Sequence, residues 1–310
     1  MEPIKTISVC LDHSNMNETL IKFSSFIVDN SLAEKIYFIN AIKNLDIPKE
    51  VLKEFPNIKK NAIKERTAFI KNEVEKHFKP QKKVSIDFTI KEGREAKTIL
   101  DIIGLNKSDL TIVGKKITTE SEGGVLALRL ARRAACSLLI VPEDTAPKMD
   151  KILLPVDFSD NAKLSVQRAI EMAALHEHKV EVLTQHVYSV PTGYHYSGKT
   201  HKEFAEIMKT HAKTDYDAFI NRIDTKGVTI KPTFNLDKND NIISDIIDRA
   251  RDIHPDFIIA GAKGRTAASA LFIGSFAEKL IHAEMPFPIF IVRPKGQNAG
   301  IIDYLKKFSK

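Results

Sequence analysis

The sequence has little of several features that mark particular protein classes. Its 310 residues include no Trp and only two Cys, and aromatic residues make up 7%. No uncharged apolar run reaches the roughly 18 residues of a membrane-spanning helix, so we expect none. The opening stretch MEPIKTISVC leads directly into a strand-like segment rather than a signal peptide. We therefore expect a cytoplasmic protein.

The two cysteines, Cys10 and Cys136, both lie in apolar, strand-like runs. One interpretation is a redox pair, and the other is two small residues of the hydrophobic core. We favour the core interpretation, because a buried free Cys packs as a small hydrophobe.

The net charge of +7 raises the question of nucleic-acid binding. Basic residues are spread over both halves of the chain, and no segment forms a basic arm or an arginine-rich helix. Few aromatic residues lie among the basic ones. The sequence therefore does not favour a nucleic-acid partner.

An internal repeat organises the whole chain. In both halves an apolar strand is followed by an Asp, a Ser two residues later and a helical pattern, and two further apolar segments recur in the same order. The matching pairs are 5–28 with 151–174, 108–116 with 255–263, and 136–142 with 287–294. We infer a gene duplication, with the polar stretch EDTAPKMD at 143–150 as the linker.

Each half predicts alternating strands and helices. In the second half we expect strands near 151–156, 180–188, 229–235, 256–260 and 288–292. Apolar residues at helical spacing predict the helices between them, namely Ala162, Val166, Ala169, Ile170 and Ala173 in one, and Ile242, Ile243, Ile246, Ile247 and Ala250 in another. Ser159 or Asp160 is the expected N-cap of the first of these helices. This pattern predicts an α/β fold of two tandem doubly wound domains, each a five-stranded parallel sheet with helices on both faces. In such sheets a ligand binds beyond the carboxyl ends of the strands, where the strand order reverses.

A glycine-rich loop follows the fourth strand of the second half. Gly261 and Gly264 are separated by two residues, and after nine more come Gly274 and Ser275 at the start of a helical pattern. Glycine lets the backbone approach a ligand closely and adopt positive φ. Ser275 is expected at a helix N-terminus, where free amides and the helix dipole favour a phosphate.

Two cations, Lys263 and Arg265, lie inside this loop. A plain glycine-rich connection with Ser275 as an ordinary cap is the alternative interpretation. The combination of glycines, Ser275 and the two cations between a strand and a helix favours phosphate binding.

The loop Gly-x₂-Gly-x₉-Gly-Ser, with Asp157 after the first strand of the same half, resembles the universal stress protein family in its tandem form. The resemblance covers about residues 5–294 and implies the fold of adenine-nucleotide α-hydrolase-like proteins. It also implies ATP or another adenine nucleotide as the ligand, with Mg²⁺ as an optional companion. By resemblance, Pro155, Val156 and Asp157 line the adenine and ribose pocket, and Val187 touches the base through its backbone. The residues implied for the ribose and phosphates are Gly261, Lys263, Gly264, Gly274, Ser275 and Phe276.

The first half departs from this pattern. Gly114 opens its loop, but Ile117 replaces the second glycine. Eight residues separate Gly114 from the pair Gly123-Gly124, against twelve between Gly261 and Gly274, and Glu120 and Glu122 occupy the loop. Two carboxylates would repel a polyphosphate, so we expect no nucleotide bound in this way there.

A competing motif, GYHYSGKT at 193–200, matches the Walker A pattern. It would make the chain a P-loop NTPase. Three bulky residues, Tyr194 to Tyr196, stand within the turn, and the first half has no counterpart, so we favour the Gly261–Ser275 loop.

No metal-binding or nucleophilic set stands out in the sequence. His176 and His178 are two residues apart at a helix end, which does not direct both to one ligand. We expect no catalytic residues and at most slow ATP hydrolysis. An ATPase or nucleotidyl transferase using the same pocket is the alternative.

The sequence as a whole predicts an ATP-binding stress-response protein, a sensor or regulator with one nucleotide site. We expect a first domain at 1–144 with a degenerate loop, a second at 145–296 with an intact loop, and a tail at 297–310. The two domains are expected to pair through the strands at 137–141 and 288–292, and a homodimer is compatible but not required.

Overall fold

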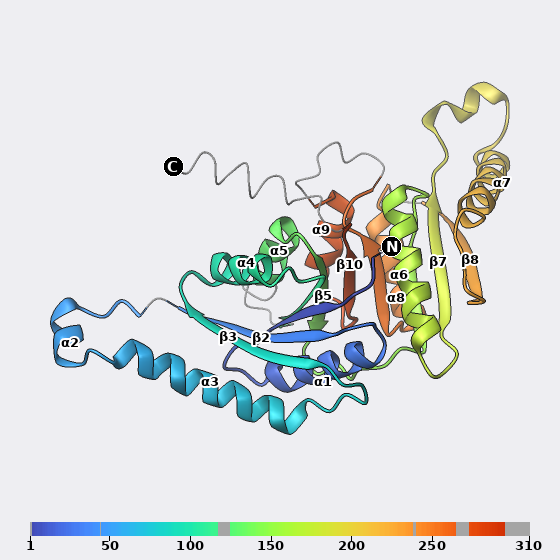
Figure 1. Cartoon of the computed structure of the whole chain (residues 1–310). Coiled ribbons are helices and arrows are strands. Elements are labelled where there is room, and N and C mark those ends of the chain that lie inside the picture. The colour runs from blue at the N-terminus through green and yellow to red at the C-terminus, as the bar shows by residue number, and fades with distance from the viewer. Residues whose placement is uncertain (1, 44, 117–124, 238–239, 265–272, 295–310) are drawn as a thin grey trace. The chain divides into compact units, whose positions relative to one another are not determined.

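The computed structural model describes residues 2–43, 45–116, 125–237, 240–264 and 273–294. The chain divides into two compact units, residues 2–147 and 148–294. Figure 1 labels the elements of both.

The first unit alternates strands and helices along the chain. Its elements are β1 (Thr6–Cys10), α1 (Met16–Asp29), β2 (Lys35–Ile42), α2 (Lys49–Glu54), α3 (Ile58–His77), β3 (Ser85–Glu92), α4 (Glu95–Leu105), β4 (Leu110–Lys115), α5 (Val125–Arg133) and β5 (Ser137–Pro142). All neighbouring strands pair in parallel, in the order β3-β2-β1-β4-β5.

The second unit repeats this plan. Its elements are β6 (Lys151–Pro155), α6 (Asp160–Leu175), β7 (Glu181–Tyr188), the 3₁₀ helix η1 (Thr192–Ser197), α7 (His201–Ile220), β8 (Ile230–Leu236), α8 (Ile242–Ile253), β9 (Phe257–Gly261), α9 (Ser275–His282) and β10 (Ile289–Val292). The order β8-β7-β6-β9-β10 is again parallel throughout. The predicted fold of two doubly wound α/β domains is confirmed.

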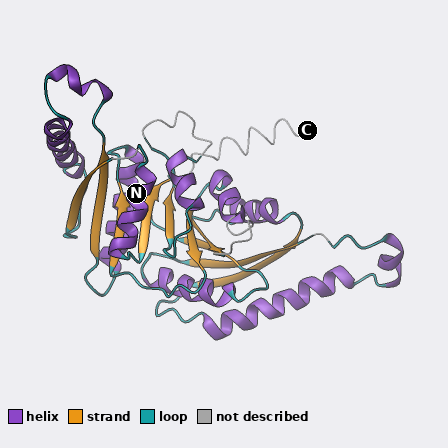
Figure 2. Cartoon of the chain, turned by 180° about the vertical axis from the view of Figure 1, so that it is seen from behind, coloured by secondary structure: helices purple, strands orange, loops and turns teal. Residues whose placement is uncertain are grey.

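Helices cover both faces of each sheet (Figure 1, Figure 2). In the first unit α1 packs beside α3 on one face, and α4 packs beside α5 on the other. In the second unit α8 contacts α9, while α6 and α7 cover the opposite face. Because the central strands are covered on both sides, their side chains are almost all buried, as in β4 and β9.

The helical stripe predicted for α6 is confirmed. Its five apolar residues from Ala162 to Ala173 are all buried, and Ser159 is the N-cap, accepting a hydrogen bond from the Ala162 amide at 3.2 Å. The stripe predicted for α8 is only partly right. Ile246 and Ala250 are buried, but Ile242 is 48% exposed, because the first turn of the helix lies outside the part that packs on the protein.

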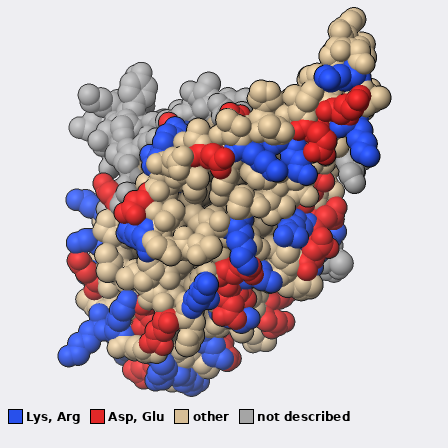
Figure 3. Space-filling model, turned by 90° about the vertical axis from the view of Figure 1, so that its right-hand side faces the viewer, with Lys and Arg blue, Asp and Glu red and all other residues tan. Residues whose placement is uncertain are grey.

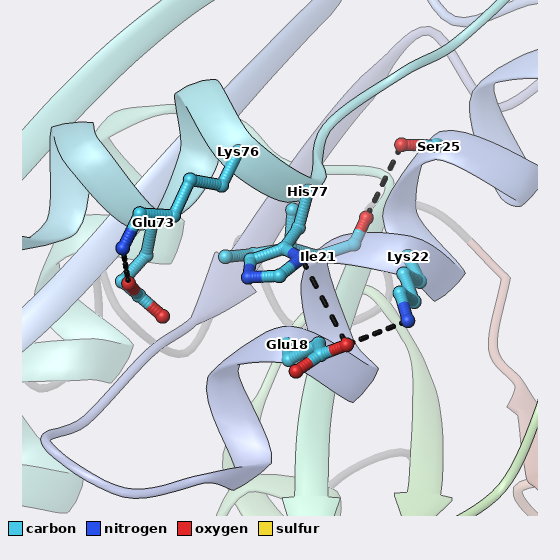
Figure 4. Close-up of polar contacts among 7 residues, drawn as sticks. All are labelled: Glu18, Ile21, Lys22, Ser25, Glu73, Lys76 and His77. Atoms are coloured by element: carbon cyan, nitrogen blue, oxygen red, sulfur yellow. Dashed lines mark hydrogen bonds and ion pairs between the residues drawn. The ribbon is translucent and has the colours of Figure 1, made fainter.

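Polar contacts between α1 and α3 support the packing in the first unit (Figure 4). The Glu18 carboxylate accepts a hydrogen bond from Lys22 Nζ at 2.6 Å and lies 3.9 Å from His77 Nδ1 of α3. The hydrogen bond and charge of Lys22, followed by the charge of His77, lower the pKa of Glu18. Within α1, Ser25 Oγ also donates to the Ile21 carbonyl.

The duplication extends to individual hydrogen bonds. Asp109, just before β4, accepts from the amides of Lys5 and Thr6, both at 2.9 Å. Asp256, just before β9, accepts in the same way from the amides of residues 150 and 151, at 2.7 and 2.8 Å. These two aspartates, which the repeat aligns, therefore fix the start of the first strand of each unit.

Candidate functional site

The predicted site residues of the second unit lie at the carboxyl ends of neighbouring strands. Residues 155–157 end β6, Val187 lies near the end of β7, and residues 261–264 end β9. Since β7 pairs on one side of β6 and β9 on the other, the strand order reverses here. This is the position at which doubly wound sheets bind ligands.

One carboxylate oxygen of Asp157 is anchored by its own turn. Its Oδ1 accepts hydrogen bonds from Ser159 Oγ at 2.6 Å and from the Ser159 amide at 3.1 Å. Asp12 and Ser14 make the same two contacts in the first unit, at 2.6 and 2.9 Å. The Asp-x-Ser turn therefore has the same conformation in both units. The other carboxylate oxygen, Asp157 Oδ2, faces Gly264 of the glycine loop.

Pro155 and Val156 offer a ligand apolar surface rather than polar groups. Val156 is 6% exposed, its amide donates to the Gln185 carbonyl at 2.9 Å, and its carbonyl lies 2.8 Å from His186 Nδ1. With both backbone groups engaged, Val156 offers a ligand only van der Waals contact.

The loop glycines are required by close approach and not by an unusual φ. A Cβ on Gly261 would lie 2.9 Å from the Asn161 carbonyl oxygen in the first turn of α6. A Cβ on Gly264 would lie 2.9 Å from Asp157 Oδ2, and one on Gly274 3.2 Å from the Lys263 Cα. Of the two properties of glycine considered for this loop, positive φ does not apply to these three residues, and Gly274 has φ −70°.

At the start of α9 the first amide groups have no hydrogen-bond partner among the residues that the structure describes. Gly274 is its N-cap and has no side chain to bond the first turn. Ser275 is therefore the first helical residue and not a cap, and its side chain is exposed. The Gly274 amide donates to the Ala262 carbonyl at 2.8 Å, which brings the two ends of the glycine loop together. First-turn amides have no partner inside a helix, so those following Gly274 remain available to an anion.

Two cations meet beside the glycine loop. Burial, followed by the charge of Arg293, lowers the pKa of the Lys263 ammonium. Arg293 directly follows β10 and is 6% exposed. Arg293 was not predicted from the sequence, although a basic residue directly after an apolar strand was the available signal. Arg265, which was predicted to contribute, lies outside the described residues.

An aromatic pair beside Asp157 was also missed. Phe158 stacks on His186 with ring centroids 4.2 Å apart and planes 23° apart. Phe158 adopts φ +64°, a left-handed conformation that is costly for an aromatic residue and is held by the surrounding packing. No sequence pattern marks such a position.

The Walker-like stretch does not form a phosphate-cradling loop. Thr192–Ser197 folds into the 3₁₀ helix η1, and the Gly198 amide donates to the His195 carbonyl. Thr200 caps α7, and its amide and hydroxyl both donate to the Glu203 carboxylate, at 2.8 and 2.7 Å. Glu203 therefore occupies the place at this helix N-terminus that a phosphate would need.

The first unit repeats only part of the site. A Cβ on Gly114 would lie 2.7 Å from the Met16 side chain, so an apolar group fills the space beside it. Ile117, Glu120, Glu122 and Gly123-Gly124, on which the predicted loss of nucleotide binding rests, lie outside the described residues.

Other features of the described chain bear on the remaining expectations. Both cysteines are buried and neither forms a disulfide bond, as expected of core residues. Within the described ranges, no group of three or more His, Cys, Asp or Glu could hold a metal ion. None of the helices described is long and apolar enough to span a bilayer. On the face drawn in Figure 3, basic and acidic side chains are interspersed and do not form one basic surface.

Comparisons with known proteins agree with this geometry. Residues 148–293 match the model of the Universal stress protein family. No curated protein matches the sequence.

Solved structures extend the likeness in fold to both units. A universal stress protein from Archaeoglobus fulgidus DSM 4304 is 13% identical, with a TM-score of 0.63, over 93% of this chain and 98% of that chain. A protein of unknown function from Pseudomonas aeruginosa PAO1 is 14% identical, with a TM-score of 0.62, over 98% of each chain. A putative universal stress protein from Pseudomonas aeruginosa UCBPP-PA14 is 13% identical, with a TM-score of 0.60, over 97% of each chain.

Proposed function

From the match of residues 148–293 to the universal stress protein family, we propose that the chain belongs to this family and that its second unit binds an adenine nucleotide, ATP foremost. In this proposal the chain acts as a sensor or regulator in the stress response and not as a catalyst. The observation that carries it is the convergence of Asp157, the glycine loop and the open start of α9 at the reversal point of the sheet.

Each part of the nucleotide has a proposed partner. The Val187 backbone contacts the adenine, and Asp157 Oδ2 accepts from a ribose hydroxyl. The triphosphate lies against Gly264, Gly274 and the amides that open α9, where the absence of a Cβ permits close approach. Lys263 and Arg293 supply the positive charge, and Mg²⁺ accompanies the phosphates where the nucleotide brings it.

Binding rather than turnover is proposed because of how Asp157 is held. Its Oδ1 already accepts two hydrogen bonds from Ser159, which fixes the carboxylate as an acceptor for a hydroxyl. A general base instead needs its carboxylate directed at an attacking water. The enzyme alternative, an ATPase or nucleotidyl transferase, would use the same pocket.

The experiment begins with mass spectrometry of small molecules released when the purified, full-length protein is denatured. Calorimetry with ATP follows on nucleotide-free protein. We expect a bound adenine nucleotide and saturation at one ATP per chain. Absence of released nucleotide together with no heat of ATP binding would refute the proposal. Rapid, saturable turnover that Asp157→Ala abolishes would instead establish the enzyme.

A further inference from the structure

The outer edge of the first sheet is open among the described residues. β3 pairs with β2 on one side, and no other described strand pairs with it (Figure 1). None of the eight residues of β3 is buried, whereas four of the five residues of β1 are. An unpaired strand edge is a template on which another extended chain can add through backbone hydrogen bonds.

The backbone groups on this edge follow from the spacing of the pairing. The Gly93 amide, directly after β3, donates to the Ile42 carbonyl of β2 at 2.9 Å. Successive residues of a strand direct their backbone groups to opposite sides, so the odd-numbered residues of β3 bond to β2. Ile86, Phe88 and Ile90 therefore direct their amides and carbonyls outward. No described residue makes a hydrogen bond with these outward groups.

The corresponding edge of the second unit is blocked. Pro232 of the outer strand β8 pairs with the fourth residue of β7, as Phe88 pairs with the fourth residue of β2. The Asp237 amide donates to the Tyr188 carbonyl at 2.8 Å, so by the same spacing Pro232 occupies an outward position. Proline has no amide hydrogen to offer a neighbouring strand, and it protects sheet edges in this way. The two units therefore differ, with one edge protected and the other open.

Apolar side chains form a row along one face of the open edge. Side chains two residues apart share a face of a strand, so Ile86, Phe88 and Ile90 lie together. Ile86 is 41% exposed, and the other two are partly exposed. The Phe88 ring stacks on Phe38 of β2, with centroids 5.8 Å apart, which fixes the row to the sheet. An added strand with apolar side chains at alternate positions would cover this row.

Two lysines without a charged partner lie at the ends of this edge. Lys83 comes just before β3, Lys91 lies near its end, and both are exposed. Neither makes a side-chain hydrogen bond or an ion pair with any described residue. The one carboxylate between them, Asp87, is already paired with Lys35 at 2.7 Å.

A third lysine adds charge above the apolar row. Lys71 Nζ of α3 lies 5.4 Å from the centre of the Phe88 ring. The edge of a second copy of the chain would carry the same lysines and would be repelled. An acidic segment would instead be attracted, so the charge around β3 selects the partner.

We propose that β3 is the docking site for an extended acidic segment of a partner protein, which adds to the first sheet as a further strand. The outward backbone groups of Ile86, Phe88 and Ile90 supply hydrogen bonds, and alternate apolar side chains of the segment cover the row. Carboxylates at the two ends of the segment meet Lys83 and Lys91. This site lies in the first unit, apart from the residues proposed for the nucleotide.

The test uses a fluorescein-labelled peptide of sequence EEVTVTVEE and the full-length protein. Its three Val match the apolar row, and its Glu residues flank them. The sequence reads the same from both ends, so it serves parallel and antiparallel pairing alike. Fluorescence anisotropy should show saturable binding at one peptide per chain. The basic peptide KKVTVTVKK should bind at least about tenfold more weakly, because it places like charges beside the lysines.

Two methylated peptides test for strand addition without any change to the protein. One carries N-methyl groups on its three Val and the other on its two Thr, which removes the amide hydrogens at those positions. Successive amides of a strand point to opposite sides, so only one of the two sets can face β3. We expect one methylated peptide to bind at least about tenfold more weakly and the other to keep its affinity within about threefold.

A proline variant tests the same edge from the side of the protein. Ile86→Pro removes an outward amide and no bond to β2, and Pro232 shows that an outer strand of this fold accepts proline at an outward position. Once circular dichroism shows it to be folded, it should bind the acidic peptide about 2- to 12-fold more weakly or worse. Ile86→Thr keeps the amide and a β-branched side chain, so its affinity should change less than about twofold.

A pair of double variants tests the lysines. Changing Lys83 and Lys91 to Gln should weaken peptide binding about 2- to 30-fold, as loss of two exposed ion pairs implies. Lys202 and Lys213 of α7 are also exposed and belong to the second unit. Changing both of these to Gln removes the same charge and should alter the affinity less than about twofold.

Four results would overturn the proposal. The first is absence of saturable binding of the acidic peptide, and the second is equal binding of the acidic and basic peptides. The third is equal affinity of the two methylated peptides, which would exclude strand addition. The fourth is self-association of the protein that Ile86→Pro abolishes in sedimentation, which would assign the edge to a second copy.

Discussion

Gly261 should be required for packing, whereas Gly264 should be required for the ligand. A Cβ at position 261 would meet the backbone of Asn161, with its carbonyl oxygen at 2.9 Å and its carbonyl carbon at 3.0 Å. The backbone in the first turn of a helix cannot move without moving the helix, so Gly261→Ala must push α6 away from β9. Overpacking of this kind costs about 1–3 kcal/mol, and the smaller unfolded-state entropy of Ala returns about 0.4–1 kcal/mol. We expect a net loss of about 1–2 kcal/mol.

At position 264 the same methyl group meets a different neighbour. Its Cβ would lie 2.9 Å from Asp157 Oδ2, a side-chain oxygen that can shift. Gly264→Ala should therefore change the free energy of unfolding by less than about 0.5 kcal/mol, the usual range for a substitution outside a packed core. It should nevertheless weaken ATP binding at least tenfold, because the methyl group displaces the carboxylate proposed for the ribose.

Gly193→Ala is the matched control for both variants. Its Cβ would meet only the Tyr196 side chain, at an ordinary contact distance of 3.8 Å. Urea unfolding followed by circular dichroism gives the free energies, and calorimetry gives the affinity for ATP. If Gly261→Ala proved as stable as Gly193→Ala, the packing argument would fail. If a folded Gly264→Ala protein bound ATP normally, the assignment of the loop would fail.

Four further outcomes follow from the same geometry. Gly274→Val should abolish ATP binding in a folded protein, because the Cβ of the new side chain would lie 3.2 Å from the Lys263 backbone. Ser275→Ala should weaken ATP binding by about ten- to a hundredfold, because one charge-assisted hydrogen bond is lost. Calorimetry measures both affinities. Lys199→Ala should change the affinity for ATP less than about threefold, since the loop that contains Lys199 is closed by internal hydrogen bonds. If Lys199→Ala lost ATP binding while Gly274→Val kept it, the site assignment would be reversed. The pKa of Lys263 is lowered, so its ammonium loses its charge at a pH below the ordinary pKa of Lys, about 10.4. ATP affinity should therefore begin to fall at a pH below that value as the pH rises. In titrations at a series of pH values, Lys263→Arg should flatten this decline. A decline unchanged by Lys263→Arg would exclude Lys263 as its cause.

The strands were predictable from the sequence because they are buried on both faces. Continuous apolar runs such as IFIV at 289–292 leave few alternatives for a short segment bounded by Pro or Gly. Both β9 and β10 begin and end within a residue of the expected positions. The exposed first turn of α8 was not predictable from periodicity. Helical spacing shows which residues share a stripe but not where the packed surface under it ends, and Ile242 lies past that end.

The sequence indicates which residues form the candidate site, but not the physical reason why each residue type is needed there. The spacing from Gly261 to Ser275 locates a loop, but a sequence gives no means of telling positive φ from close approach. Only the three-dimensional neighbours, such as Asn161 beside Gly261, decide between them. Arg293 was missed because it comes from a strand 30 residues beyond Lys263, and only the pairing of β9 with β10 brings the two together. The left-handed Phe158 depends on packing that no local pattern encodes.

The aspartates that fix the first strand of each unit also bear on how the chain folds as it is synthesised. The amide of Lys5 donates a hydrogen bond to a carboxylate 104 residues later in the chain, and the amide of Asp150 to one 106 residues later. At about 5–20 residues per second, β1 leaves the ribosome some 5–20 s before Asp109 exists to hold it. During that interval β1 can pair with β2 but not with β4, so its other edge stays open. In each unit the first strand thus gains its second neighbour only when the fourth strand emerges, and a ribosome stalled before that point would hold a nascent chain in which that apolar edge is unpaired.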